Sequence, residues 1–266
     1  MMFRSILLKS LWDFRKAALY WTGGIFFLAI YIIFVVSQVP LDQFAAIADA
    51  FPKALQQFVG GEGGLDFGSI EGFLNAQIFT ILAPIMIIGL AVNSGGKATA
   101  SEETAKSLDI VLSAPISRDR FIIEKILSMI FKVAFIAVIH WLAYAVSGAL
   151  FSETIPLEGL FAICLNLFLL GVTFGMIGIM IGTFNGNAAQ AVGISAALAL
   201  LSYLIANIAP LVETLDSTKY FSLFYYYKAG DPLKAGIHAW HWTPFVGCII
   251  IFFITSVFQF KRRNLL

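Results

Sequence analysis

Long apolar stretches constrain the fold of this chain more than any other feature. Six of them approach or exceed the roughly 20 residues that a helix needs to cross a hydrocarbon core ~30 Å thick. We predict membrane-spanning helices at residues 17–37, 77–93, 121–151, 159–184, 188–212 and 243–260. Because every backbone polar group must be paired inside lipid, the predicted fold class is an all-α integral membrane protein, with one transmembrane domain over residues 1–266.

Composition agrees with this class and excludes others. The chain is 59% hydrophobic and 12% charged, with a mean hydropathy of +0.88, which is far from the values of soluble domains. Its net charge of +1 gives no support for binding nucleic acid, which requires a basic surface. Cys164 and Cys248 both lie in apolar spans, so we expect packed thiols with no disulfide and no metal site.

Residues 1–16 are predicted to form a separate interfacial helix lying on the membrane. One face is apolar, with Phe3, Ile6, Leu7, Leu11 and Phe14, and the other carries Arg4, Lys9, Asp13, Arg15 and Lys16. The alternative is the start of a signal peptide. It is disfavoured because the apolar run that follows, residues 17–36, is longer than the hydrophobic region of such a peptide.

The longest polar interruption runs from residue 93 to residue 125. Thr99 and Glu102 form a capping-box pattern, and Glu103 adds negative charge where a helix N-terminus favours it. We expect a short amphipathic helix over residues 99–114, which ends before Pro115. Its apolar face holds Leu108, Val111 and Leu112, with Lys106 and Asp109 largely elsewhere.

A second helix is predicted to begin at Ser117, which can cap it, with Asp119 in its first turn. This helix continues into the third span. A continuous helix over residues 118–151 would be roughly 50 Å long, against a hydrocarbon core of ~30 Å. We therefore expect its first turns to project from the membrane as a stalk.

Lys and Arg residues are unevenly divided between the two sides that six spans define. Eleven lie in segments 4–16, 97–120 and 261–263, and four lie on the opposite side, at Lys53, Lys219, Lys228 and Lys234. The excess of basic residues places both termini and segment 99–114 in the cytoplasm.

Small residues recur along the fourth span at spacings of four, three and four, a pattern that lets another helix approach closely. They are Gly171, Gly175, Gly178 and Gly182. We expect the partner to be the fifth span of the same subunit, through Ala189, Gly193 and Ala197, with a second subunit as the alternative. Residues 185–187, Asn-Gly-Asn, predict a tight turn between these two spans.

Other candidate functional residues and motifs have less support in the sequence. His140, Asn166 and Asn207 are polar residues within spans, and interhelical hydrogen bonding is favoured slightly over a direct functional role. His238 and His241 with Asp231 would suit a metal, but an aromatic external segment over residues 210–242 favours interfacial polarity instead. Residues 95–97 lack the flanking residues of a phosphate-binding loop.

The segment from Glu102 to Lys125 resembles the cytoplasmic signature of ABC-2 type transporter permeases, roughly E-x-x-x-G-T-L-x-x-L-L-x-x-P-[IV]-S-R followed by a Lys. The residues that fit are Glu102, Ser107, Leu108, Val111, Leu112, Pro115, Ile116, Ser117, Arg118 and Lys125. Lys106 departs from the pattern, because the family usually has Gly there. Further similarity covers most of the chain, including blocks 15–21, 71–74, 221–225 and 260–265, and the combination looks most like the antibiotic and multidrug exporter branch.

This resemblance implies a non-catalytic membrane subunit of an ATP-driven exporter in a prokaryotic plasma membrane. Two permeases, identical or homologous, would pair with two copies of a cytoplasmic ATPase. ATP and Mg²⁺ would bind that ATPase, so no cofactor is expected on this chain. The implied ATPase-coupling residues are Glu102, Glu103, Leu108, Asp109, Val111, Leu112, Pro115, Ser117 and Arg118.

Spans with few charges suit a hydrophobic or amphipathic cargo, such as a drug, antibiotic, peptide or lipid. Candidate residues of the substrate path are Phe79, Met86, Tyr203 and Asn207. Copper-enzyme maturation or sodium export, which similar chains also serve, stays an alternative. A channel or secondary transporter that needs no ATPase is a further one, and it should show buried paired charges or broken helices near mid-membrane.

Overall fold

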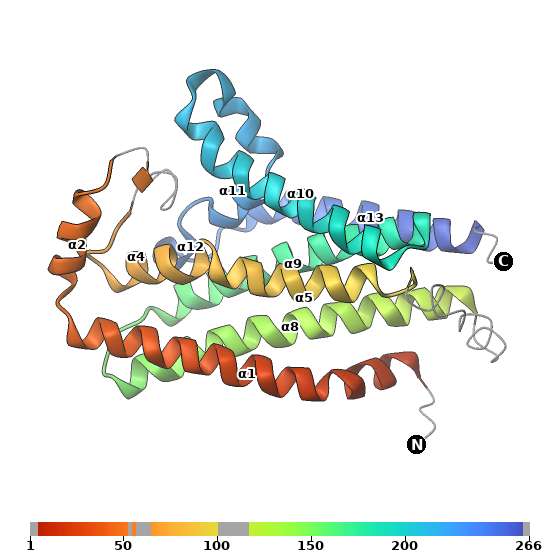
Figure 1. Ribbon diagram of the computed structural model, residues 1–266, viewed down its shortest axis with the longest axis horizontal. Helices are drawn as coiled ribbons and strands as arrows, with labels where there is room; N and C mark the ends of the chain where they lie inside the picture. The colour runs from red at the N-terminus through yellow and green to blue at the C-terminus, as the bar shows by residue number, and fades with distance from the viewer. Residues whose placement is uncertain (1–4, 53–54, 57–64, 101–116, 263–266) are drawn as a thin grey trace.

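The computed structural model describes residues 5–52, 55–56, 65–100 and 117–262, and every regular element in this part of the chain is helical. The long helices run side by side (Figure 1). They are α1 (Ile6–Gln38), α5 (Leu82–Gly96), α8 (Arg118–Leu150), α9 (Leu157–Asn185), α10 (Ala188–Ile208) and α13 (Thr243–Arg262). The short elements are α2 (Leu41–Asp49), α4 (Ile70–Leu74), the π-helix η1 (Asn75–Phe79), α11 (Leu223–Lys228), α12 (Pro232–Ala235) and the 3-10 helices η2 (Ala209–Leu211), η3 (Glu213–Phe221) and η4 (Ala239–Trp242).

Five helical stretches in the described part are long and apolar enough to cross a membrane. They are Ile6–Gln38, Ile70–Gly96, Leu157–Asn185, Ala188–Leu211 and Ala239–Arg262. Each corresponds to one of the predicted spans, but α8, which contains most of the predicted span 121–151, is not among them. The prediction of six spans is therefore not confirmed. As predicted, α8 is one continuous helix of 33 residues, and it runs beside the others (Figure 1).

The separate interfacial helix predicted over residues 1–16 is not confirmed either. Residues from Ile6 onward are the first turns of α1, which runs unbroken to Gln38. Neither Gly nor Pro occurs before Gly23, so this stretch contains no strong helix breaker. The charged face led to the prediction that this segment lies on the membrane surface. Charged side chains on one face do not end a helix, however.

The two ends of the bundle differ in what they contain. At one end, which we call the terminal end, lie both chain termini, the start of α8 and the turn between α9 and α10 (Figure 1). That turn is tight, as predicted: Gly186 has φ 64°, and the side chain of Asn187 accepts a hydrogen bond of 3.0 Å from Gln190 N. The opposite end, the loop end, holds α2, α4, α11 and α12.

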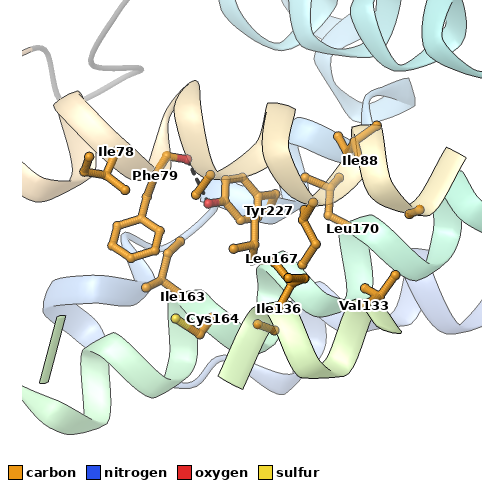
Figure 2. Packing of buried hydrophobic residues seen from close by; sticks show 14 of the residues in the cluster. Ile78, Phe79, Ile88, Val133, Ile136, Ile163, Cys164, Leu167, Leu170 and Tyr227 are labelled. Carbon is orange, nitrogen blue, oxygen red and sulfur yellow. Dashed lines mark hydrogen bonds between the residues drawn. The ribbon is translucent and has the colours of Figure 1, made fainter. Parts of the chain in front are cut away.

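Helix α9 is central to the bundle, since most of its residues are buried. Figure 2 shows Leu167 and Leu170 of α9 among Ile136 of α8 and Ile88 of α5. Lipid is as apolar as these side chains, so close packing rather than exclusion from water holds them together in a bilayer. The outer faces of α1, α10 and α13 expose large apolar side chains, as expected of surfaces that contact lipid.

The second span is irregular at η1. Thr80 N donates to Asn75 O at 2.8 Å, a bond one residue longer than the α-helical spacing. Pro84, at the start of α5, lacks an amide hydrogen, and its ring crowds the carbonyl four residues earlier. The phenol of Tyr227 donates a hydrogen bond of 2.8 Å to Phe79 O (Figure 2). A backbone acceptor at the irregularity thus gains a partner from another segment.

Candidate functional site

The predicted coupling segment lies almost entirely outside the described residues. The predicted coupling residues that lie outside are Glu102, Glu103, Leu108, Asp109, Val111, Leu112 and Pro115. The helix expected over residues 99–114 therefore stays a prediction. Its C-terminal flank is described. Ser117 Oγ accepts a hydrogen bond of 3.3 Å from Arg120 N, which confirms the predicted cap of the second helix.

The start of α8 is attached to the end of α13. Arg118 Nη1 donates to Lys261 O at 3.5 Å, and Lys261 Nζ lies 2.9 Å from Asp119 Oδ2. One turn further along, the rings of Phe121 and Phe260 stack with centroids 5.5 Å apart and an interplanar angle of 11°. Polar and aromatic contacts together therefore join the first turn of α8 to the last turns of α13.

The same part of α8 also holds the start of α1. Glu124 accepts hydrogen bonds of 3.0 Å from Ser5 Oγ and 3.0 Å from Leu7 N. Arg120 Nε donates to the other carboxylate oxygen at 2.8 Å. A carboxylate at a helix N-terminus also interacts favourably with the helix dipole. The first two turns of α8 thus contact both the first and the last long helix of the chain.

The glycine stripe of α9 packs mainly against α5 of the same subunit. The prediction of α10 as its main partner was therefore wrong. A Cβ added at Gly95 of α5 would lie 2.2 Å from Gly175 O, and one added at Gly178 would lie 3.0 Å from Gly96 N. Nothing lies within 4 Å of a Cβ built at Gly193 of α10. We call the contact of Gly95 and Gly96 with Gly175, Gly178 and Gly182 the glycine seam.

The other members of the stripe have mixed neighbours. A Cβ at Gly171 would approach Val133 and Ile87, from α8 and α5, and one at Gly182 would lie 3.2 Å from Gly96 O. Gly182 also has a side chain of α10 within ordinary contact distance, Ala191 Cβ at 3.7 Å. Ala91 and Gly95 repeat the small-residue spacing on α5, and this was the signal in the sequence that pointed to α5.

The candidate path residues lie in separate places. Phe79 is fully buried beside Tyr144, with ring centroids 5.6 Å apart, and Met86 is half-buried on α5. Tyr203 and Asn207 lie together on α10, where Asn207 Nδ2 donates to Tyr203 O at 2.7 Å. The pair on α10 is the part of the predicted set that the structure brings together.

Lys228 of α11 joins this pair and had not been predicted as a path residue. Lys228 Nζ donates to Asn207 Oδ1 at 3.1 Å and lies 6.0 Å from the ring centroid of Tyr203, within reach of a cation–π contact. Burial lowers the pKa of Lys228 to about 8. The signal for it in the sequence was a single Lys that ends an aromatic run over residues 224–227.

Asn166 forms hydrogen bonds to two other segments. Trp242 Nε1 donates to Asn166 Oδ1 at 2.8 Å, and Asn166 Nδ2 donates to Tyr227 O at 3.1 Å. His140 Nδ1 lies 2.9 Å from Ile136 O on its own helix. Asn166 therefore connects α9 with α11 and η4, which is the interhelical role favoured from the sequence.

At the loop end, an ion pair joins α12 to the segment that precedes α4. Lys234 of α12 forms a hydrogen-bonded ion pair with Asp66, which also accepts from Gly68 N at 2.9 Å and Ser69 Oγ at 2.7 Å. Burial opposes the charge on Asp66, but hydrogen bonds from Lys234, Ser69 and Gly68 lower its pKa below the usual value. Burial raises the pKa of the neighbouring Asp231.

The loop end shows no metal centre in the part of the chain that the structure describes. The rings of His238 and His241 have centroids 5.8 Å apart. No group of three or more His, Cys, Asp or Glu side chains that could hold an ion occurs among the described residues. The metal alternative for His238, His241 and Asp231 thus gains no support.

Comparison with known protein families matches residues 4–265 to a family described as ABC-2 family transporter protein. The match covers nearly the whole chain, including the segment before α8 and all the long helices. No curated protein matches the chain closely enough to be reported.

Proposed function

The chain belongs to the ABC-2 family of transporter proteins, and on this basis we propose that it is the permease of an ATP-driven exporter. Family membership makes it a multi-pass membrane transport component that is not catalytic by itself. In our proposal a separate cytoplasmic ATPase binds ATP and Mg²⁺ and drives alternating access. The terminal end of the bundle faces the cytoplasm of a prokaryote, α8 crosses the plasma membrane as a sixth span, and a hydrophobic or amphipathic substrate leaves the cell.

The observation that best supports this proposal is the double attachment of α8. Segment 99–114, the proposed contact with the ATPase, leads directly into Ser117 and Arg118. From there Lys261 connects α8 to α13, and Glu124 connects it to α1. A displacement of segment 99–114 would therefore move the ends of three long helices together, as coupling of an ATPase to a transport path requires.

The glycine seam supplies a fixed element for such a movement. Gly95 and Gly96 lie at the end of α5, immediately before the proposed coupling segment, and they approach the backbone of α9 directly. Backbone contact of this kind leaves little freedom for sliding. In our proposal α5 and α9 form the fixed pair, against which α1, α8 and α13 tilt.

The proposed substrate class follows from the character of the helices. In the described part, large apolar side chains dominate the exposed surfaces of α1, α10 and α13. The polar group formed by Tyr203, Asn207 and Lys228 lies where α10 approaches the loop end. An apolar path with few polar groups suits an amphipathic compound entering from the bilayer, whereas an anionic polymer would need many basic groups.

Copurification tests the proposal. The tagged chain is extracted gently from its native host, and the proteins bound to it are identified and quantified by mass spectrometry. We expect a stoichiometric ATPase with a phosphate-binding loop, two copies for each pair of permeases. If the chain is isolated alone under conditions that preserve a known transporter complex, the exporter proposal is wrong, and a channel or secondary transporter becomes the better hypothesis.

A further inference from the structure

A cavity of about 480 Å³ lies between α1, α5 and α8 toward the terminal end of the bundle. Its polar lining includes Ser10 of α1, Ser94 of α5, and Ser128 and Lys132 of α8. No role in coupling or in the substrate path accounts for a lysine and three hydroxyl groups gathered from three helices. We call these four residues the hydroxyl–lysine cluster.

The hydrogen bonds within the cluster occupy both acceptor positions of Ser10 Oγ and one of Ser94 Oγ. Ser10 Oγ accepts from Ser128 Oγ at 2.6 Å and from Lys132 Nζ at 2.9 Å. Ser94 Oγ accepts from Lys132 Nζ at 3.4 Å. The O–H groups of Ser10 and Ser94 and the third N–H of Lys132 then remain to donate. Among the described residues, no acceptor takes these three hydrogens, so the cluster presents donors to the cavity.

The cluster is also positively charged. Lys132 is half-buried, and no carboxylate in the described part of the chain forms an ion pair with it. Lys97 and Lys125 line the same cavity. Asp13 lies near enough to interact with the charge of Lys132, but the hydrogen-bond partners of the half-buried ammonium are hydroxyl groups, and this favours an anion in the space beside it. The ligand expected here has anionic oxygen atoms that accept several hydrogen bonds at once.

The cavity changes character along its length. On α1 its lining runs from Ser10 through Phe14 and Ala17 to Trp21, a distance of about 16 Å along the helix. On α5 it runs in the same direction, from Lys97 and Ser94 to Leu90. One end is therefore cationic and hydroxylated, and the other end is apolar. A free inorganic anion would use the first end alone, whereas an amphiphile fits both.

The position of Lys132 along α8 agrees with the boundary of a bilayer. From Lys132 to the last residue of α8, Leu150, the helix rises about 27 Å, close to the ~30 Å of a hydrocarbon core. If Leu150 lies at one face of the core, Lys132 lies near the other, at the level of lipid headgroups.

We propose that this cavity binds an anionic phospholipid, with its phosphate on the hydroxyl–lysine cluster and part of an acyl chain along Phe14, Ala17 and Trp21. The bound lipid joins α1, α5 and α8 at the terminal end. This inference is independent of the exported substrate. Its assignment to the cytoplasmic leaflet depends on the orientation proposed above, but the lipid class does not.

The test compares lipid retention by the full-length protein. The chain, with any copurifying partner, is reconstituted in nanodiscs with equal amounts of phosphatidylglycerol and phosphatidylcholine, released into detergent, and analysed by native mass spectrometry. We expect selective retention of one phosphatidylglycerol per chain. Lys132→Gln should lower this retention about tenfold, the cost of one charge-assisted hydrogen bond, and Lys132→Arg should largely keep it.

Two further variants make the result specific. Ser10→Ala removes a donor without a charge and should weaken retention less than Lys132→Gln, and it serves as the test if Lys132→Gln does not fold. Lys9→Gln removes an exposed lysine of the terminal end outside the cavity and should leave lipid retention unchanged. Equal retention of both lipids by the wild type, or undiminished retention in folded Lys132→Gln and Ser10→Ala, would overturn the proposal.

A final arm separates lipid from free phosphate. Inorganic phosphate is added to the protein in phosphatidylcholine nanodiscs, and binding is measured by calorimetry. Weak or undetectable binding of phosphate, together with retention of phosphatidylglycerol, supports a lipid site. Tight phosphate binding that is lost in Lys132→Gln, without selective lipid retention, would show that the cluster binds the free anion and that the lipid assignment is wrong.

Discussion

The carboxylate of Glu124 on α8 accepts a hydrogen bond of 3.0 Å from the backbone amide of Leu7 on α1. The first amides of an α-helix have no partner within the helix, so a side chain that accepts from them acts as a cap. Here the cap comes from a residue 117 positions away in the sequence. The N-terminus of α1 is therefore completed by the helix that follows the proposed coupling segment.

Glu124→Ala should weaken the attachment of α1 to α8. We expect a loss of about 2 kcal/mol in the free energy of unfolding, because the variant removes a charged acceptor from two donors of α1. Thermal unfolding of the purified protein in detergent measures the change. Arg120→Ala is the matched control: Arg120 is more than half exposed, and an exposed pair of this kind contributes little. Equal effects of the two variants would contradict the assigned role of Glu124.

Leu108→Asp together with Leu112→Asp should release the ATPase. Both leucines lie on the apolar face predicted for the coupling helix, and a charge there would be desolvated on binding at considerable cost. The measurement is the amount of ATPase that copurifies, with Lys106→Gln, predicted to lie largely off that face, as the control. An unchanged complex in the double variant would refute the coupling-helix assignment.

Gly175→Leu should disrupt the packing of α9. A Cβ at this position would lie 2.6 Å from Met129 Sδ and 3.3 Å from Ala91 Cβ, so α5, α8 and α9 would have to separate. Overpacking of this kind costs about 1–3 kcal/mol and often more when backbones are displaced. Gly193→Leu is the control, since nothing lies within 4 Å of its Cβ. The measurement is the yield of folded protein by size-exclusion chromatography, and normal assembly of Gly175→Leu would contradict the seam.

Gly95→Ala is a sharper version of the same test. The added methyl group would lie 2.2 Å from Gly175 O, which is a backbone atom and cannot rotate away. We expect a lower unfolding temperature from this single methyl group, whereas Gly193→Ala should leave it unchanged or raise it slightly through helix propensity. Identical unfolding temperatures for the two variants would show that the seam is looser than the structure indicates.

Asp231→Asn should stabilise the loop end at neutral pH. Burial raises the pKa of Asp231 in the folded state above its usual value of 3.8, so its charged form opposes folding once the pH exceeds that folded pKa. Asn tolerates the positive φ of 46° at this position. The gain in unfolding temperature should be present at pH 7 and should vanish below about pH 4, where the wild-type carboxyl is protonated in both states. A gain of equal size at both pH values would exclude this cause.

How far the sequence predicted the structure depended on the range of the interaction. Ser117, Gly186 and Asn187 act on neighbours within a few residues, so the cap of α8 and the turn after α9 were both predictable. The stripe on α9 was also visible, because helical periodicity fixes which residues share a face. Periodicity does not say which helix that face meets, and so α5 was missed as its partner.

Sites assembled from distant segments were the least predictable. Ser10, Ser94 and Lys132 belong to three different helices, and each looks ordinary within its own sequence. Lys228 and Asn207 meet because η3 returns the chain toward α10, and no local pattern indicates this. The π-helix η1 likewise receives a hydrogen bond at Phe79 O from the distant Tyr227, which no local pattern indicates.

The orientation of the bundle leads to the last prediction. With both termini in the cytoplasm, Glu62, in the segment between the first two spans, lies outside the cell. A cysteine introduced by Glu62→Cys, after both native cysteines are replaced by Ala, should react with a membrane-impermeant maleimide in intact cells. Ser117→Cys, exposed at the terminal end, should react only after the membrane is opened. The reverse pattern would place the loop end and Lys234 in the cytoplasm. It would also remove segment 99–114 from the compartment that contains ATP, and the exporter mechanism would then fail at its first step.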